Sequence, residues 1–331
     1  MAAGQRPVLA LDIGGTKLAV GVVTDDGRTH AYRVEPTRRE EGPDVILDRL
    51  FNLGQSAIDD ADLGEVVAVG ISCGGPLDAK AGVLLSPLHL PGWINVRITD
   101  RATERFGVPA VLENDATAAA LGEYRYGAAR DAATALYLTV STGIGGGAVI
   151  DGRLHRGAAG NGGEFGHVMV RPGGRECMCG RFGCLEGYAS GSSIAQRATE
   201  AIVGGTPSSL AKLDTVRGED VSAAALAGDP LATEIWNETV DVLAIAITDL
   251  VNVFEPNIVV LGGGVTRSGS QLIDPVRSAV KRDAMRPAAA AVSIELAALG
   301  DEVCVVGAGA RAFDYVAELA QATESAEPAR V

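Results

Sequence analysis

Three of the five cysteines of this chain stand in one short stretch, and one of its four histidines lies just before them. Cys177, Cys179 and Cys184 form a C-x-C-x4-C cluster, with His167 ten residues upstream of the first cysteine. This is the ligand set of a closed, tetrahedral Cys3His zinc site. The spacing therefore predicts that these four residues hold one structural zinc ion.

Two carboxylates flank this stretch, Glu164 at its start and Glu186 at its end, and glycines fill much of the sequence between them. A metal that fixes a glycine-rich loop carrying two acids acts as a clamp, and the acids are then available to face a ligand. What that ligand is has to be inferred from the elements that position the loop.

The first such element is a glycine corner near the N-terminus. An apolar strand is expected at Val8–Ile13, ended by Gly14, Gly15 and Thr16 and followed by a second strand at Leu18–Val23. The N–H groups of such a corner can line a phosphate, and Asp12 can reach a phosphate-bound Mg²⁺ directly or through water. A plain glycine hairpin is the alternative interpretation.

The same order recurs about 130 residues later. A strand at Ala135–Ser141, a glycine corner at Thr142–Gly147 and a strand at Ala148–Ile150 repeat the first pattern. The repeat indicates a duplicated fold with phosphates held between the halves. A Rossmann interpretation is weaker, because the third spaced glycine is missing and a strand follows where a helix should.

A strand at Ala110–Leu112 leads into Asn114 and Asp115 and then into a helix over Thr117–Tyr126. Either Asn114 or Asp115 could simply cap that helix. An aspartate at the carboxyl end of a sheet strand is also where open α/β sheets bind ligands. Asp115 is therefore the candidate general base for phosphoryl transfer, which needs a carboxylate to take the proton of the acceptor.

Further glycines follow two other strands. Gly75 lies in a Gly-Gly-Pro turn after a strand at Val66–Ser72, where backbone could approach a ligand. Ile258–Leu261 runs into Gly262, Gly263 and Gly264, a junction suited to close approach by an adenosine. A last strand is expected at Val303–Val306 and a terminal helix at Ala310–Ala320, with order ending near Ala322.

Composition narrows the class of protein. The chain has 331 residues, 47% of them hydrophobic and 21% charged, which is ordinary for a globular enzyme of about two domains. A net charge of −14 argues against a nucleic-acid or anionic-membrane surface. The start of the chain, MAAGQRP, lacks the apolar region of a signal peptide, and the clustered cysteines fit a metal site in a reducing cytosol. We therefore expect a cytoplasmic protein without membrane spans.

At this point the motifs match a known family. The chain resembles the ROK family (repressors, open reading frames and sugar kinases) of the actin/hexokinase-like ATPase superfamily, from Asp12 to about Ala312. The most specific motif is C-x-C-G-x-x-G-C-x-E over Cys177–Glu186, preceded by G-E-x-G-H over Gly163–His167. D-x-G-G-T-K, E-N-D-A and G-x-G-G-G occur in the family's order.

The resemblance implies a fold, an activity and a site. The fold would be an α/β, duplicated actin-like (ribonuclease H-like) ATPase fold with two lobes around a central cleft and a structural zinc loop. The small lobe would comprise residues 1–116 and 304–331, with a returning C-terminal helix, and the large lobe residues 117–303, with the zinc loop at 164–186. Zinc is implied on His167 and the three cysteines, with His167 also touching the sugar. The implied sugar contacts are Gly75, Asn114, Asp115, Glu164, His167 and Glu186, with Asp115 as base. The implied ATP contacts are Asp12, Gly14, Gly15, Thr16, Lys17, Thr142, Gly143, Gly145, Gly262, Gly263 and Gly264.

The function expected from the resemblance is an ATP- and Mg²⁺-dependent kinase that phosphorylates the 6-hydroxyl of a hexose, with glucose the first choice. An amino- or N-acetyl-hexosamine kinase, acting on glucosamine, kanosamine, GlcNAc or ManNAc, is the alternative within the same class. A sugar-responsive regulator without a DNA-binding domain is the rival from another class. The resemblance also implies a dimer or tetramer.

One residue departs from the family pattern. Where family kinases commonly read N-L-P-G-W, this chain has His89 before Leu90, Pro91, Gly92 and Trp93. Histidine is bulkier than asparagine and can carry charge. The change is either a harmless loop substitution or a sign of a substituted or amino hexose as substrate. Trp93 is either a core residue or the wall of a sugar site.

Overall fold

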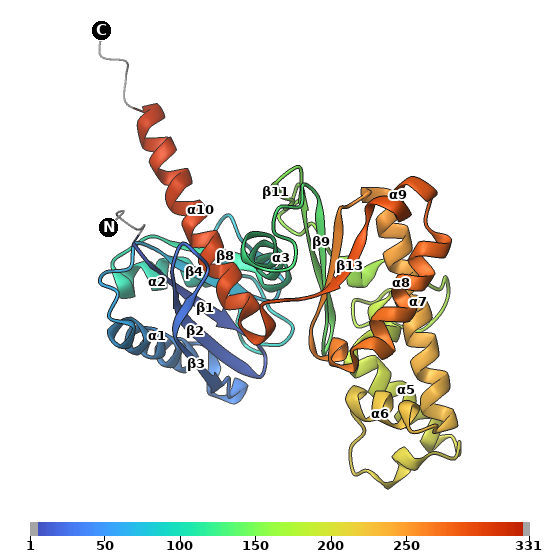
Figure 1. The fold of residues 1–331 in the computed structure, drawn as a ribbon. Coiled ribbons are helices and arrows are strands. Elements are labelled where there is room, and N and C mark those ends of the chain that lie inside the picture. The colour runs from blue at the N-terminus through green and yellow to red at the C-terminus, as the bar shows by residue number, and fades with distance from the viewer. Residues whose placement is uncertain (1–5, 327–331) are drawn as a thin grey trace. The chain divides into compact units, whose positions relative to one another are not determined.

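The computed structural model describes residues 6–326, which divide into two compact units (Figure 1). The first unit contains the described residues up to Arg130, the segment Arg156–Asn161 and the chain from Asp301 onward. The second contains Asp131–His155 and Gly162–Gly300.

The first unit is built on a five-stranded sheet in the order β3-β2-β1-β4-β8. Strand β1 pairs antiparallel with β2 and parallel with β4, and β4 pairs parallel with β8. All residues of β1 and β4 are buried, and so are most residues of β2, as expected for strands covered on both faces. The strands are β1 (Val8–Ile13), β2 (Lys17–Val23), β3 (Thr29–Pro36), β4 (Val69–Cys73) and β8 (Ala110–Asn114). A small sheet of β5 (Leu77–Asp78), β6 (Val83–Leu84) and β7 (Val96–Arg97) lies beyond β4 in sequence.

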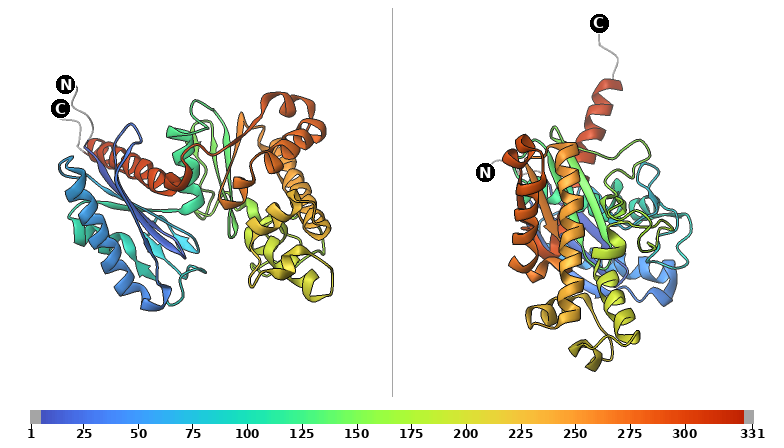
Figure 2. Two further views of the ribbon diagram at one scale, coloured as in Figure 1. Left: turned by 60° about the horizontal axis from the view of Figure 1, so that its bottom comes forward. Right: turned by 90° about the vertical axis from the view of Figure 1, so that its right-hand side faces the viewer.

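Helices cover both faces of this sheet, and each face has its own core (Figure 2). Side chains of α1 and α2, such as Ile46 and Ile98, pack with Leu9 and Leu11 on one face. Side chains of α10, such as Ala308, pack with Ala10 on the other, where α3 lies against α10. The helices are α1 (Gly42–Ala61), α2 (Ile98–Phe106), α3 (Asp115–Tyr126) and α10 (Val303–Ala326).

The second unit repeats this plan with strand order β11-β10-β9-β12-β13. Strand β9 pairs antiparallel with β10 and parallel with β12, and β12 pairs parallel with β13. The strands are β9 (Ala135–Val140), β10 (Ile144–Ile150), β11 (Arg153–Leu154), β12 (Ile258–Gly262) and β13 (Ser293–Leu296). The helices are α4 (Glu186–Ala189), α5 (Gly191–Val203), α6 (Gly218–Leu226), α7 (Pro230–Phe254), α8 (Ser270–Asp283) and α9 (Arg286–Ala291).

The two sheets therefore share one topology, a hairpin with an extra antiparallel strand on one side and two parallel strands on the other. The glycine corners Gly14–Thr16 and Ser141–Gly143 occupy the same place in each, the turn between the first two strands. The duplicated α/β fold expected from the sequence is confirmed.

The strand expected at Val303–Val306 is wrong, because α10 already begins at Val303 and continues past Ala322 to Ala326. The glycines that follow the apolar run serve close helix packing. A Cβ atom on Gly307 would lie 1.9 Å from the carbonyl oxygen of Ala118 in α3, so only glycine permits this approach. A short apolar run cannot by itself distinguish a buried strand from a buried helix.

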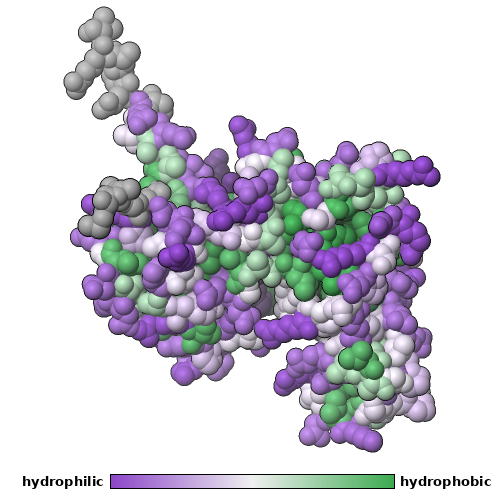
Figure 3. Space-filling view, in the orientation of Figure 1, coloured by the Kyte–Doolittle hydropathy of each residue, from purple (hydrophilic) through white to green (hydrophobic). Residues whose placement is uncertain are grey.

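The division of the chain at residues 116/117 and 303/304 stays a prediction. The contacts group α3 and the chain as far as Arg130 with the first sheet. No helix in the range 6–326 is long and apolar enough to cross a membrane, and Glu234, Glu238, Asp241 and Asp249 interrupt α7. On the face drawn in Figure 3, hydrophilic residues cover most of the first unit and hydrophobic ones gather mainly over the second.

Candidate active site

The candidate base stands where β8 passes into α3. Asn114 has extended backbone, and its side-chain oxygen accepts hydrogen bonds from the N–H groups of Ala116 and Thr117 at 3.0 and 3.1 Å. Asn114 is therefore the N-cap, which leaves Asp115 as the first residue of the helix. One carboxylate oxygen of Asp115 accepts from the N–H of Ala116 at 2.8 Å, and the other lies close to Gly74.

Burial raises the pKa of the Asp115 carboxyl above its usual value, while the N–H of Ala116 and the nearby His89 lower it. A carboxylate whose proton affinity is increased by its surroundings is better suited to take a proton from a hydroxyl. The position and the electrostatics of Asp115 both fit a general base.

Asp12 is the penultimate residue of β1 and is almost completely buried, with 7% of its surface exposed. The hydroxyl of Ser72 donates a hydrogen bond to one Asp12 oxygen at 2.6 Å. Burial raises the pKa of Asp12 to about 6, against the hydrogen bond from Ser72, and the charge of Asp115 raises it further, whereas Lys17 lowers it. A buried carboxylate with so little local compensation fits a place where a cation binds.

The corner between β1 and β2 is shaped for an anion. The N–H of Gly14 bonds to the carbonyl of Lys17 at 3.0 Å and closes the turn. Within residues 6–326, the N–H groups of Gly15 and Thr16 donate to no protein acceptor. These donors, with the nearby ammonium of Lys17, could receive phosphate oxygens.

Two more residues complete this part of the first unit. Gly75 follows β4, and its carbonyl accepts the N–H of Leu88 at 3.4 Å. His89, in the same loop as Leu88, lies against Gly15 and Gly74. Trp93 is 1% exposed and belongs to the apolar core, so the core interpretation of this residue is correct.

The second unit has a matching corner between β9 and β10. Thr142 and Gly143 form the turn, and their N–H groups donate to no acceptor among the described residues. Glu186 lies directly beside this corner, because its carboxylate accepts the N–H of Ile144 at 2.7 Å. A Cβ on Gly143 would lie 2.8 Å from the same oxygen, so a residue with a side chain would crowd the carboxylate at this position. Gly145 follows inside β10, opposite Thr139 of β9.

The proposed zinc ligands are brought together as expected. One ligand atom from each of His167, Cys177, Cys179 and Cys184 lies within 4.8 Å of the other three. Cys177 Sγ and His167 Nδ1 are 3.7 Å apart, and Cys179 Sγ and Cys184 Sγ are 3.8 Å apart. Tetrahedral zinc with Zn–S bonds of about 2.3 Å places its sulfurs about 3.8 Å apart, so this arrangement fits zinc.

The two ring nitrogens of His167 have different neighbours. Nδ1 is directed to the cysteines, whereas Nε2 lies 3.9 Å from a carboxylate oxygen of Glu164. Zinc and a sugar hydroxyl could therefore use different nitrogens of one ring. Glu186 joins the same group, since its second oxygen is 3.8 Å from Cys177 Sγ.

The zinc loop is held by backbone hydrogen bonds as well. Cys177 N–H bonds to the carbonyl of Arg181 at 2.8 Å, and the N–H of Leu185 bonds to Val168 at 2.9 Å. Gly183 has φ +82°, and a Cβ there would lie 1.8 Å from the carbonyl oxygen of Arg171. The glycines of this stretch thus permit tight turns between the ligands.

The third glycine junction lies beside the second corner. Gly263 has φ +92°, and a Cβ there would be 2.5 Å from the carbonyl oxygen of Val140. Gly262, at the end of β12, approaches Tyr137 in the same way, and Gly264 begins the 3₁₀ turn Gly264–Ser268. Two further glycines in this cluster were not predicted, because they belong to no motif. Gly191 packs on Ser141 and Gly218 packs on Gly191.

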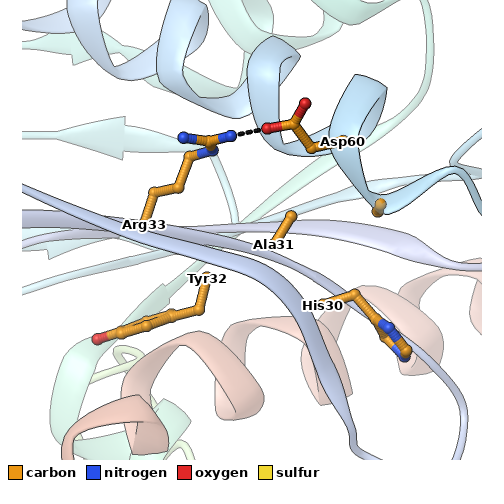
Figure 4. A pocket seen from close by; sticks show the side chains of 6 residues that line it. His30, Ala31, Tyr32, Arg33 and Asp60 are labelled. Atoms are coloured by element: carbon orange, nitrogen blue, oxygen red, sulfur yellow. Dashed lines mark ion pairs between the residues drawn. The ribbon is translucent and has the colours of Figure 1, made fainter.

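A separate cavity of about 370 Å³ is lined by residues of β3 and of the end of α1 (Figure 4). It is lined by His30, Ala31, Tyr32, Arg33, Asp60 and Ala61. Arg33 forms an ion pair with Asp60 of α1, whereas Tyr32 points to the other side of the strand. None of the expected site residues lines this cavity.

The predicted residues thus form two sets. The first unit holds Asp12, Gly14, Gly15, Thr16, Lys17, Gly75, Asn114 and Asp115, and the second holds the remaining ones. Sequence reasoning missed Ser72 as the partner of Asp12 and Arg156, which forms a 2.8 Å ion pair with the buried Glu113. Neither residue belongs to a recognisable motif.

Fold and site together define a duplicated, actin-like ATPase with a Cys3His cluster. The chain belongs to the ROK family, whose family model matches residues 8–314, and the resemblance seen in the sequence is confirmed. It is 33% identical to a glucokinase of Streptomyces coelicolor over 91% of this chain and 95% of that protein. It is 35% identical to an N-acetylmannosamine kinase of Citrobacter koseri over 78% of this chain and 83% of that protein.

Solved structures show the same likeness. The ROK hexokinase from Thermus thermophilus superposes with a TM-score of 0.81 at 36% identity, covering 94% of this chain and 99% of that one. A ROK family glucokinase from Streptomyces griseus, solved in complex with glucose and AMPPNP, superposes with a TM-score of 0.75 at 33% identity, covering 93% and 99%.

Proposed function

We propose that this protein is an ATP-dependent sugar kinase that transfers the γ-phosphoryl group of ATP to the 6-hydroxyl of a hexose, with glucose as the preferred substrate. The observation that carries the proposal is Asp115, a carboxylate with a raised pKa at the start of α3, directly after β8. The sheet that contains β8 also carries the corner Gly14–Thr16, where the N–H groups of Gly15 and Thr16 have no acceptor among the described residues. The likeness to a glucokinase bound to glucose and AMPPNP supports it.

Phosphoryl transfer requires mainly positioning and charge stabilisation. The corner Gly14–Lys17 and the corner Thr142–Gly145 would bind the phosphates of ATP, and Gly262–Gly264 its adenosine. Asp12 would hold Mg²⁺, which neutralises phosphate charge when bound. Asp115 would take the proton of the acceptor hydroxyl as the bond to phosphorus forms.

The sugar would be recognised by hydrogen-bonding groups. Asn114 uses its oxygen as a helix cap, so its amide N–H groups remain to donate to a hydroxyl. Gly75, Glu164, His167 and Glu186 would supply the other contacts. Glu186 is already fixed by Ile144, and fixed acceptors of this kind favour specific recognition of hydroxyl groups.

Zinc in this account is structural. The four ligands leave no open position for substrate on the metal, as in closed zinc sites. The ion would fix the loop that carries Glu164 and Glu186. Its chemistry is to order the chain, and the transfer itself would use the protein carboxylate and the nucleotide.

An N-acetyl-hexosamine kinase is the second candidate. It is favoured by the 35% identity to an N-acetylmannosamine kinase and by His89 in place of the usual asparagine. Glu164 and Glu186 could serve either class of sugar.

A panel of hexoses in a coupled ADP-release assay separates the candidates. Glucose, mannose, glucosamine, kanosamine, N-acetylglucosamine and N-acetylmannosamine would be compared by kcat/KM, with Asp115→Asn as the inactive control. We expect glucose to give the highest value. A preference for an N-acetyl sugar would favour the second candidate, and absence of ADP with every sugar would refute both.

A further inference from the structure

His89 occupies a narrow position in the first unit between two glycines. A Cβ on Gly15 would lie 3.0 Å from His89 Cβ, and a Cβ on Gly74 would lie 2.5 Å from His89 Cε1. Only residues without a side chain leave room for the ring at both places. The hydrogen bond from Leu88 N–H to the Gly75 carbonyl holds the loop there. The imidazole therefore lies between the phosphate corner and the end of β4.

The ring shares this space with the candidate base. Both side chains approach the point where a Cβ on Gly74 would lie. His89 Nδ1 is 3.1 Å from this point, and one carboxylate oxygen of Asp115 is 3.5 Å from it. Two polar atoms so close to one point can contact the same small group. An acceptor hydroxyl within hydrogen-bonding distance of Asp115 would place the arriving phosphoryl group near His89.

The other ring nitrogen of His89 lies beside a buried thiol. His89 Nε2 lies 4.0 Å from the sulfur of Cys73, which is fully buried. Burial raises the pKa of the Cys73 thiol well above its usual value, so the sulfur keeps its hydrogen. The thiol can donate weakly to Nε2 or accept weakly from Nε2–H, and in the first arrangement the proton of a neutral imidazole resides on Nδ1. With the proton on Nδ1, the N–H of the ring lies beside Gly74, the glycine that one Asp115 carboxylate oxygen also approaches.

We propose that His89 is a second catalytic residue, whose Nδ1–H donates a hydrogen bond to the phosphoryl group as it passes to the hydroxyl held by Asp115. This inference rests on the proposed kinase function. In the transfer, the bond from phosphorus to ADP breaks, the bond to the acceptor oxygen forms, and the hydroxyl proton goes to Asp115. His89 keeps its proton and stabilises negative charge on the phosphoryl oxygens.

Amide substitutions test which ring nitrogen matters. In His89→Asn the amide nitrogen takes the place of Nδ1, whereas in His89→Gln it takes the place of Nε2. Loss of one donor to a transition state typically lowers kcat about 10²-fold or more. We expect a loss of that order for His89→Gln and His89→Ala, and at most a several-fold loss for His89→Asn. KM for ATP and sugar should change little. Leu88→Ala, in the exposed part of the same loop, is the matched control.

The outcomes separate this inference from the function on which it rests. A wild-type protein that forms no ADP with any sugar refutes the kinase proposal itself. An active wild type with unchanged kcat in His89→Ala, or with equal kcat in the Asn and Gln variants, overturns the role of His89. Nitrogen-15 NMR of the ring provides a second readout without substrate. Protonation on Nδ1 is expected, and protonation on Nε2 would overturn the assignment.

Discussion

From the sequence, either Asn114 or Asp115 could cap the helix, and Asp115 is also the candidate base. Asn114 caps α3 through its side-chain oxygen, and this allows Asp115 to direct one carboxylate oxygen toward Gly74. The helix cap and the proposed base are therefore separate residues, and each can be changed without directly removing the other.

The change Asp115→Asn removes the proton acceptor and keeps the size of the side chain. General-base catalysis contributes about 10²- to 10⁴-fold, so we expect kcat to fall by at least that factor. Sugar affinity measured by calorimetry should stay within a few-fold of the wild type, because the amide still hydrogen-bonds a hydroxyl. Strong turnover in this variant would remove Asp115 from the role of base.

At Asp12 the proposed function and the stability of the folded protein oppose each other. Its pKa is raised to about 6 in the folded protein, so the folded state binds this proton more tightly than the unfolded chain. Its contribution to stability is therefore greatest below about pH 4 and is lost as the pH rises through 6. A shift of this size corresponds to about 3 kcal/mol.

Asp12→Asn should therefore stabilise the ligand-free protein. Ser72 can still donate to the amide oxygen, and the buried charge is gone. Denaturant unfolding without Mg²⁺ or ATP should show a gain of about 1 to 3 kcal/mol at pH 7.5 that shrinks toward pH 5. Kinase activity should be lost in the same variant. A variant less stable than wild type at pH 7.5 would contradict the assigned origin of the pKa.

At this scale the sequence predicts residues that stand next to one another in a motif. Asn114 and Asp115 adjoin a strand end, and His167 lies close to its cysteines along the chain. Ser72 and Asp12 are 60 residues apart, and their hydrogen bond exists only because β1 and β4 pair. Such partners follow from strand register, which short patterns do not determine.

Among the elements, the zinc loop is the one whose order we expect to depend most on a bound ion. One ligand atom from each of its four predicted ligands lies within 4.8 Å of the others, and the strand pairing between these residues is limited to isolated bridges, such as Met169 with Cys184. Structural zinc contributes about 10 to 16 kcal/mol of binding free energy in small peptides. Loss of the ion should loosen the loop and the two glutamates at its ends.

Cys179→Ser tests this dependence, with the exposed neighbour Met178→Ser as control. We expect about one zinc ion per chain in wild type by metal analysis. The Cys179 variant should contain less zinc, melt at lower temperature and show a raised KM for sugar, with KM for ATP less affected. A purified wild type without zinc, together with an unchanged Cys179 variant, would refute the clamp.

A second structural device lies in the segment Arg156–Asn161, which groups with the first unit although its neighbours in the chain belong to the second. Arg156 pairs with Glu113, whose side chain is 1% exposed, at 2.8 Å, and Arg311 approaches the same carboxylate at 3.8 Å. The N–H of Asn114 also bonds to Glu113, so this ion pair lies one residue from the helix cap.

Arg156→Met should destabilise the protein by about 2 kcal/mol, because it leaves a buried charge with one weaker partner. The double variant Glu113→Gln with Arg156→Met should regain part of this loss in a double-mutant cycle. Arg153→Met, at an exposed position nearby, should unfold like wild type. Equal stability of Arg156→Met and wild type in denaturant titrations would show that the pair contributes nothing.

Elements were predictable where their pattern was long. Strand β1 has the bounds that its continuous apolar run predicts, whereas β3 and β13 were not expected and the sequence predicted a strand at the start of α10. Strand β3 is only partly buried and has a mixed pattern, so it lacks the apolar signature of β1. The identity of such elements is decided by the neighbours they pack against.

For the whole molecule, the duplicated order of glycine corners predicted the duplicated sheets, because each corner is the turn of an equivalent hairpin. The acidic charge of −14 and the family membership agree with a small-molecule substrate. The motifs determine less about which sugar binds, since Glu164, His167 and Glu186 can meet hydroxyl groups of several hexoses. Oligomeric state stays a prediction.

The central claim is that this chain phosphorylates the 6-hydroxyl of a hexose with ATP. The most direct measurement is phosphorus-31 NMR of purified protein incubated with ATP, Mg²⁺ and glucose. We expect the γ-phosphate signal of ATP to be replaced by the signals of ADP and of a hexose 6-phosphate, and we expect Asp115→Asn to form neither product. Release of free phosphate alone, or an unchanged ATP spectrum with every sugar of the panel, would contradict it.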